Sequence, residues 1–318
     1  TISVLFILLF IACDNQADYN KHLIKIDSLI TLKPDTALSM LKALPMDSLQ
    51  TQADSAYYAL LMTEAKDKNF FIQTDDSLIQ SALAYYNKTN DLEKQARAYY
   101  YSGCVYRDSK KKKEAMTQYL MAQPLAEEAG EKRLLSLIYN NIGYLYYAQD
   151  WNEQADSIFQ LTEQMAIQLK DSILQAEALS QQGLIQMEKG KAFYPEAERM
   201  MLKALDIAEK FSNIQLKRNI FSSLSQLYNW MEDGDKSIEF AKRNLSIQKN
   251  RATCYEAYKF LGSAYYQTSQ YDSALYYLQK SLSTVDYATK AGAYMYLADI
   301  AKEQGDLATS LEMERNYS

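Results

Sequence analysis

The single histidine, His22, limits the catalytic chemistry that this chain can perform. A Ser-His-Asp hydrolase site would have to use it, and no nucleophile motif surrounds it. The sequence also has no His-Glu-x-x-His zinc motif, no pair of nearby cysteines and no glycine-rich phosphate loop. The 40 acidic residues are scattered mostly over polar faces, where solvated charge is the ordinary role. We therefore predict a protein that is not an enzyme, with no catalytic residue, no metal site and no cofactor.

Non-covalent binding is the chemistry that the composition favours. The chain has 27 tyrosines among 318 residues, and tyrosine and arginine are the residues that most often anchor protein interfaces. The formal net charge is -6, and neither half of the chain is markedly basic. Because a nucleic-acid binder normally carries a basic face, we expect no nucleic acid to bind through this segment.

The elements that must position these side chains are helices. Only 9 glycines and 4 prolines are present, and strong helix formers dominate the composition. Six small residues recur in steps of 40, 40, 42, 37 and 36 positions. A second small residue follows each of them, twelve positions later or, in the third case, fourteen: Gly103/Ala115, Gly143/Ala155, Gly183/Ala197, Ser225/Ser237, Gly262/Ala274 and Ala298/Ser310.

A glycine inside a helix costs roughly 1 kcal/mol relative to alanine. A recurring one therefore indicates that a neighbouring helix comes close enough to exclude a Cβ atom. We expect the second small residue, such as Ala155 for Gly143, to be its partner on the next helix. One helical hairpin repeated at a near-fixed period predicts a stacked α-solenoid.

The residues around these positions resemble the tetratricopeptide repeat (TPR) family, whose pattern is an aromatic residue, Leu-Gly, Tyr, Ala, an aromatic residue and Ala. One unit reads Tyr99, Ser102-Gly103, Tyr106, Ala115, Tyr119 and Ala122, and another reads Tyr258, Leu261-Gly262, Tyr265, Ala274 and Leu278. The period is mostly longer than the usual 34 residues, and no proline closes each second helix. The resemblance implies an all-α solenoid of stacked helix-turn-helix repeats forming a right-handed superhelix.

Two weaker units precede the clear ones, at residues 18–44 and 53–88. We therefore expect residues 14–318 to form about seven helical hairpins and a partial last one. The last unit ends without a polar capping helix, which solenoids need. This favours a natural chain that continues past Ser318, or a partner that covers the edge.

The TPR resemblance also implies that the first helix of each pair lines a concave surface. The inward positions lie six and three residues before the small residue, and one and four after it. Leu137, Cys104 and Glu177 occupy such positions. Those that we predict to contact a ligand are Arg97, Tyr100, Arg107, Asn140, Tyr144, Tyr147, Asn229, Glu256, Lys259 and Tyr266. The alternative for several of the tyrosines is packing between adjacent repeats.

One TPR subtype grips the C-terminal carboxylate of chaperone partners with lysine and asparagine at set groove positions. Tyr100 and Cys104 stand where those two residues would lie, so we do not expect chaperone docking by that route. Cys104 and Cys254 lie in first helices of distant repeats. We predict that they are buried or groove-lining thiols and not a disulfide.

The N-terminus resembles a bacterial lipoprotein signal. Residues 2–12 are an apolar run, too short to span a membrane, that ends at Cys13. Phe10-Ile-Ala-Cys13 is similar to a lipobox, in which the cysteine is lipidated. We expect residues 1–13 to be a signal peptide truncated at its start and the protein to be anchored in the cell envelope, facing the periplasm or exterior. The alternative is a buried N-terminal helix with an incidental cysteine.

These observations lead to three functional hypotheses. The first is a membrane-anchored TPR scaffold that binds a protein or extended peptide in its concave groove. The second is the extracytoplasmic sensor portion of a TPR-containing transmembrane signalling or transcriptional regulator, truncated at Ser318. The third is glycan capture, which we rank low. Glycan-binding relatives of this kind carry long insertions, whereas only two inserted residues are seen here.

Overall fold

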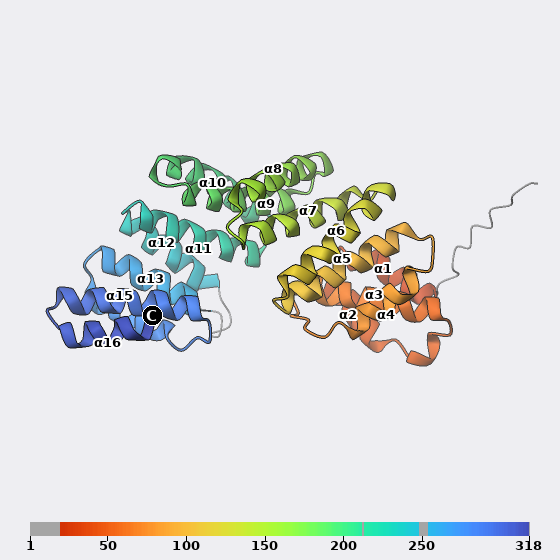
Figure 1. Cartoon of the computed structure of the whole chain (residues 1–318), viewed down its shortest axis with the longest axis horizontal. Helices are drawn as coiled ribbons and strands as arrows, with labels where there is room; N and C mark the ends of the chain where they lie inside the picture. The colour runs from red at the N-terminus through yellow and green to blue at the C-terminus, as the bar shows by residue number, and fades with distance from the viewer. Residues whose placement is uncertain (1–19, 212, 248–253, 318) are drawn as a thin grey trace, which may run out of the picture. The chain divides into compact units, whose positions relative to one another are not determined.

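The computed structural model describes residues 20–211, 213–247 and 254–317, and these form helices without a single strand. Sixteen α-helices occur in the described ranges, joined as eight successive pairs (Figure 1). The first helices of the pairs are α1 (Lys21–Ile30), α3 (Gln52–Lys68), α5 (Leu92–Asp108), α7 (Lys132–Tyr147), α9 (Ser172–Glu188), α11 (Ile214–Trp230), α13 (Tyr255–Gln267) and α15 (Tyr287–Glu303). The second helices are α2 (Pro34–Ala43), α4 (Ser77–Tyr86), α6 (Lys112–Glu128), α8 (Asn152–Leu169), α10 (Tyr194–Lys210), α12 (Gly234–Ile247), α14 (Tyr271–Ser281) and α16 (Leu307–Tyr317). Two short 3-10 helices are also present: η1 (Met46–Ser48) lies between α2 and α3, and η2 (Lys191–Phe193) lies between α9 and α10.

The chain divides into two compact units, Thr1–Ile138 and Tyr139–Ser318, with the boundary inside α7. In unit 1, α1 packs on α3 and α3 packs on α5. In unit 2, α9 packs on α11, α11 on α13 and α13 on α15. Each of these seven first helices also contacts its own second helix. The predicted all-α stack of helical hairpins is confirmed. No helix in the described part of the chain is long and apolar enough to cross a membrane.

The mid-helix glycines mark the close contacts that the sequence predicts, but the partner is different. A Cβ atom built on Gly143 would lie 2.8 Å from Cε1 of Phe159, and one on Gly183 would lie 2.8 Å from Cγ of Met201. Phe159 lies four residues beyond Ala155, which we expected to be the partner. The glycine on the first helix therefore makes room for a large side chain on the second helix, which lies one turn beyond the second small residue.

Serine replaces both small residues in the unit that contains α11 and α12. The Ser225 hydroxyl donates to the Ser237 carbonyl oxygen at 3.0 Å, and the Ser237 hydroxyl donates to the Ser225 carbonyl oxygen at 2.8 Å. Both serines are buried. Because each buried hydroxyl finds a carbonyl acceptor, the substitution carries no unsatisfied polar group.

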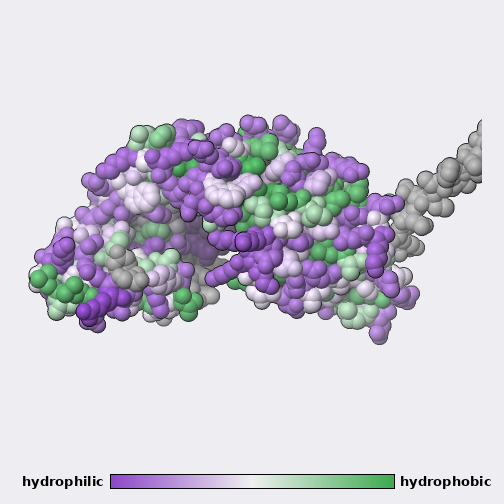
Figure 2. Space-filling model, viewed as in Figure 1, coloured by the Kyte–Doolittle hydropathy of each residue, from purple (hydrophilic) through white to green (hydrophobic). Residues whose placement is uncertain are grey.

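The turns inside all the hairpins except the first share one backbone feature. The second or third residue after a first helix is left-handed, with φ of +60° at Phe70 and Lys110, +57° at Ser269 and +80° at Gly305. These turns are short in most pairs; residues 109–111 join α5 to α6, for example. Residues 69–76 join α3 to α4, which makes this turn five residues longer. The surface in view is mostly hydrophilic, with smaller apolar groups among the polar residues (Figure 2).

Candidate functional site

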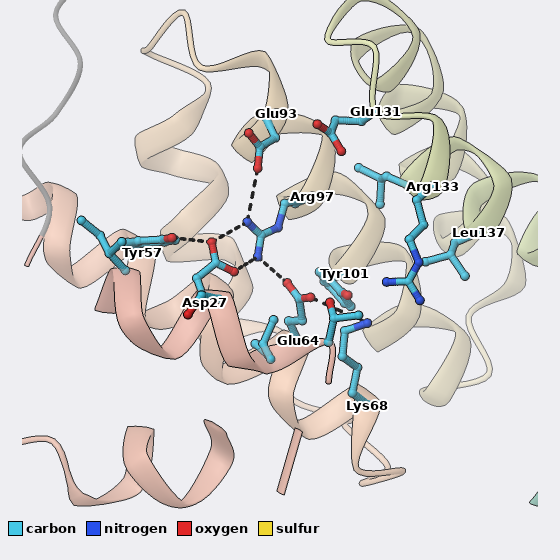
Figure 3. A pocket seen from close by; sticks show the side chains of 15 residues that line it. Asp27, Tyr57, Glu64, Lys68, Glu93, Arg97, Tyr101, Glu131, Arg133 and Leu137 are labelled. Atoms are coloured by element: carbon cyan, nitrogen blue, oxygen red, sulfur yellow. Dashed lines mark hydrogen bonds and ion pairs between the residues drawn. The ribbon is translucent and has the colours of Figure 1, made fainter. Parts of the chain in front are cut away.

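Unit 1 contains a cavity of about 440 Å³. Its walls come from α1, α3 and α5, together with α7 and the residue before it, which are the first helices of four consecutive hairpins (Figure 3). We call it the unit 1 cavity. Among the predicted inward positions, it contains Arg97 and Leu137.

Arg97 lies at the centre of the polar wall and reaches carboxylates from three helices. Its guanidinium makes a two-pronged contact with Asp27, with Nη2–Oδ1 and Nη1–Oδ2 distances of 2.6 and 3.0 Å. Nη2 also donates to Oε2 of Glu64 at 2.7 Å, and Nη1 lies 3.5 Å from Oε1 of Glu93. The side chains of Arg97 and Glu64 are 12% and 6% exposed, whereas that of Glu93 reaches solvent. Paired contacts of this kind fix the orientation of the guanidinium as well as its position.

The charges around Arg97 support one another electrostatically. Burial by itself would raise the pKa of the Asp27 carboxyl, but the hydrogen bonds and charge of Arg97 outweigh it and hold that pKa below its usual value. Tyr57 donates its hydroxyl to Oδ2 of Asp27, the oxygen that also accepts from Nη1 of Arg97, and burial together with the Asp27 charge raises the pKa of Tyr57. Asp27 therefore stays ionised, with both of its oxygens occupied, at neutral pH.

The opposite wall offers different groups. Figure 3 shows Arg133, Leu137 and Glu131 facing the cavity from the α7 side, and Lys68 below Glu64. Ile24 lines the same space and is 50% exposed. Carboxylates, cations, a phenol ring and aliphatic carbons thus border one hollow. This set can hydrogen-bond a polypeptide backbone and accommodate side chains of either charge, but it presents no activated nucleophile.

The next predicted pair, Arg107 and Tyr100, belongs to a separate cluster. Nη2 of Arg107 lies 2.9 Å from Oδ1 of Asp67 and 3.0 Å from Oδ1 of Asp108, and the guanidinium is partly exposed. Tyr100 is buried, with its ring against Tyr101 at 4.9 Å and Tyr119 at 5.8 Å. The prediction that Tyr100 lines an open groove is wrong, because neighbouring aromatic rings enclose it.

Cys104, beside this cluster, is fully buried and forms no disulfide. Burial raises the pKa of its thiol to about 12. A thiol must lose its proton to act as a nucleophile, so Cys104 is an inert core residue. Cys254 is likewise buried and free. Cys13, the predicted lipidation site, lies outside the described residues.

In unit 2, α7 and α9 bring Asn140 and Glu177 together. Nδ2 of Asn140 donates to Oε2 of Glu177 at 3.2 Å, and burial raises the pKa of Glu177 to about 7. Asn140 is buried, which contradicts its predicted place on an open surface. Tyr144 packs edge-on against Phe159. Tyr147 remains half-buried and donates its hydroxyl to Glu188.

The remaining predicted residues of unit 2 lie on α11 and α13. Asn229 is buried and donates to the Ser263 hydroxyl at 3.0 Å, so its predicted role as a groove residue is also wrong. Lys259 is half-buried, with its ammonium 4.3 Å from the centre of the Phe260 ring, and burial lowers its pKa.

Glu256 and Tyr266 lie on the same helix. Glu256 is exposed. Tyr266 donates to Oε1 of Glu303 at 2.8 Å, and its ring lies 5.7 Å from that of Tyr296. The structure places no cluster of His, Cys, Asp or Glu suited to a metal ion within the described residues.

Sequence reasoning missed the carboxylates that hold Arg97. Asp27 lies in the weak first hairpin, where no small-residue register can be read. Glu64 and Tyr57 had a usable signal. Thr63 occupies the position in α3 that the first small residue occupies in the other hairpins. Glu64 follows it by one residue and Tyr57 precedes it by six, and both spacings belong to the predicted inward positions.

Comparison with known proteins supports the fold. No family model matches the chain, and a search of curated proteins finds no match. Among solved structures, NprR in complex with its cognate peptide NprX has a TM-score of 0.67 at 16% identity, covering 93% of this chain and 87% of that one. Aspartyl phosphate phosphatase F from Bacillus subtilis has a TM-score of 0.63 at 14% identity, covering 95% and 85%. A tetratricopeptide repeat protein from Parabacteroides merdae ATCC 43184 has a TM-score of 0.55 at 17% identity, covering 83% and 92%. The chain has the TPR-like solenoid fold.

Proposed function

We propose that the protein is a non-enzymatic TPR scaffold that binds an extended peptide, or an extended segment of a protein, on the first-helix face of unit 1. The observation that carries this proposal is the unit 1 cavity, to which four consecutive first helices contribute. Adjacent packed helices are about 9 Å apart, and an extended chain advances about 3.3 Å per residue. A segment that crosses all four helices would therefore have about eight residues.

The chemistry of the walls suits a peptide better than a small metabolite. Arg97 is already satisfied by Asp27 and Glu64, so it serves to fix those carboxylates in place. Glu93 and Glu131 can then accept hydrogen bonds from backbone N–H groups or pair with a cationic side chain, and the Leu137 side chain offers an apolar contact. Rigid, pre-oriented side chains reduce the entropy lost on binding. The solved NprR structure, of similar fold, contains a bound peptide.

The same proposal places the scaffold at a membrane, in the cell envelope. Its basis is the apolar run of residues 2–12 followed by Cys13. Metabolic labelling of native cells with an alkyne-bearing fatty acid would test it. The full chain should acquire label, and Cys13→Ser should acquire none. Label retained in Cys13→Ser would overturn the anchoring site without affecting the proposal for the cavity.

Site-specific photo-crosslinking tests peptide binding. The photoreactive residue p-benzoylphenylalanine replaces Ile24, which lines the cavity, or Leu120, on α6; both side chains are 50% exposed. In native cells, the probe at position 24 should crosslink a defined polypeptide whose modified residue lies in an extended segment, and the probe at position 120 should not. Equal yields of the same products from both positions would refute binding in the cavity.

A further inference from the structure

The turn between α3 and α4 differs from the other hairpin turns in both length and composition. Residues 69–76 join these helices, against residues 109–111 in the next pair. The additional length carries Phe70, Phe71 and Ile72, which are 75, 51 and 81% exposed. Single exposed apolar side chains are ordinary, but a contiguous group on a projecting turn marks an interaction surface. We call these three residues the apolar turn.

The backbone of the apolar turn is held in place from both sides. The Phe71 N–H donates to the Lys66 carbonyl oxygen at 3.0 Å. The Gln73 N–H donates to Oδ2 of Asp108 at 3.0 Å, and its side-chain amide donates to the Thr63 carbonyl oxygen at the same distance. The three side chains are therefore presented to solvent by a fixed backbone.

The left-handed residue of this turn is also unusual. Phe70 has φ of +60°, a conformation that bulky residues rarely adopt. At the equivalent position the other turns with this conformation have polar residues or glycine: Lys110, Asp150, Gly190, Glu232, Ser269 and Gly305. A phenylalanine here gains nothing from burial within the chain, because it is exposed. Its presence is explained if the ring is buried against something outside the chain.

We propose that the apolar turn inserts into the interfacial region of a phospholipid bilayer and forms a second membrane contact beside the N-terminal anchor. This inference rests on the proposed anchoring through Cys13. Six residues separate Cys13 from Asn20, which hydrogen-bonds Asp54 near the start of α3. A chain of that length reaches at most about 25 Å. The 17-residue α3 is also about 25 Å long, so the turn at its far end lies within range of the same bilayer.

Charge and size favour a bilayer over a protein groove. The Lys42 ammonium lies 5.5 Å from the centre of the Phe71 ring. When the turn inserts, this cation would lie near the lipid phosphates while the ring enters the apolar region. Three side chains are far fewer than the 20 to 30 residues per side of a typical stable protein interface. They suit shallow insertion that supplements an anchor, because membrane attachment commonly combines two weak signals.

An environment-sensitive probe on the turn tests this proposal. In the full chain with Cys13→Ser, Ile72→Cys carries the fluorophore NBD, and a matched variant carries it at Val285→Cys, which is fully exposed in unit 2. Cys104 and Cys254 are buried and take no label. An N-terminal histidine tag holds both proteins on phosphatidylcholine vesicles that contain a nickel-chelating lipid, so surface attachment does not depend on lipidation.

NBD at position 72 should brighten about twofold or more on the vesicles, with blue-shifted emission and quenching by brominated acyl chains, and NBD at position 285 should not. Phe70→Ser with Phe71→Ser should abolish the change at position 72. Water-like emission at position 72 on vesicle-bound protein would overturn the proposal. So would an emission change without vesicles that grows with protein concentration, since that would indicate a second copy of the chain. Failure of peptide crosslinking at position 24 would leave this result unaffected.

Discussion

Gly103 on α5 lies directly beneath the ring of Tyr119 on α6, so closely that an added Cβ atom would overlap the ring. Tyr119 is fully buried and cannot move aside. The contact joins the two helices of the third hairpin. The same relationship holds for Gly143 with Phe159 and for Gly262 with Leu278. It is the physical reason for the period that the sequence displays.

Gly103→Ala should therefore destabilise the protein. Overpacking of a tight core contact costs about 1–3 kcal/mol, which exceeds the gain of roughly 1 kcal/mol in helix propensity. Gly292→Ala is the matched control, because a Cβ there meets only the flexible Lys259 side chain, at 3.1 Å. Urea unfolding should show a lower midpoint for Gly103→Ala and an equal or higher one for Gly292→Ala. Equal destabilisation by both would contradict the packing explanation.

Arg97→Met should destabilise unit 1 strongly. The substitution leaves Asp27 and the buried Glu64 without their cation, and removing one partner of a buried ion pair costs about 3–5 kcal/mol. Arg199→Met removes one partner of an exposed pair with Glu196, where solvent screening leaves the pair little effect on stability. Thermal and urea unfolding of the two variants distinguish these cases. A small effect at Arg97 would mean that water or rearranged side chains compensate the stranded carboxylates.

Glu177 should make the stability of unit 2 fall as the pH rises. Its pKa is raised from 4.5 to about 7 in the folded state, so the folded form holds a proton that the unfolded form has lost. The stabilisation is complete below pH 4.5 and is lost as the pH rises through 7, by an amount on the order of 3 kcal/mol. Glu177→Gln stays neutral and should be more stable than the wild type above pH 7.

Urea midpoints measured from pH 4 to pH 8.5 would show the two curves separating above pH 5. Asp171 provides a control, since its charge contributes to the raised pKa of Glu177. Asp171→Asn preserves a capping side chain; in this background the difference between Glu177 and Glu177→Gln should be smaller and should be complete at a lower pH. Parallel curves for wild type and Glu177→Gln would show that Glu177 titrates near its ordinary value.

Cys104 should resist alkylation in the native protein. Its thiol is fully buried, with a pKa of about 12, so the reactive thiolate is scarce and inaccessible at pH 8. Iodoacetamide should modify Cys104 only after unfolding in urea, whereas an exposed cysteine from Val285→Cys should react at once. Mass spectrometry of peptides from native and unfolded samples gives the comparison. Rapid native modification would show that α5 opens locally.

The fold could be predicted from the sequence because close helix contacts require small residues inside helices at a regular spacing. Gly103 and Gly143 have no other reason to stand inside helices. The surface was harder to predict, because a repeat register states which side a residue occupies and not whether a neighbour covers it. Tyr100 and Asn140 both stand three residues before the small position, and both are buried.

Arg97 lines the unit 1 cavity, but the sequence did not reveal the carboxylates that it contacts. Asp27 is 70 residues away, and its hairpin lacks the small residues that set the register elsewhere. Such a contact depends on how three hairpins stack, which local spacing does not encode. The sequence did not reveal the apolar turn either, because its length and its exposed apolar residues are unusual only when compared with the turns of the other hairpins.

The Arg97 contacts also bear on how the N-terminal end of the stack opens. In repeat proteins each unit ordinarily touches only its neighbours, and stability is a sum of local and adjacent terms. Arg97 belongs to the third hairpin and grips Glu64 in the second and Asp27 in the first. A single guanidinium therefore links the third hairpin directly to the first, which is not its neighbour in the chain. Amide exchange in α1, α3 and α5 should accordingly proceed as one cooperative event, with the terminal hairpin protected from fraying alone.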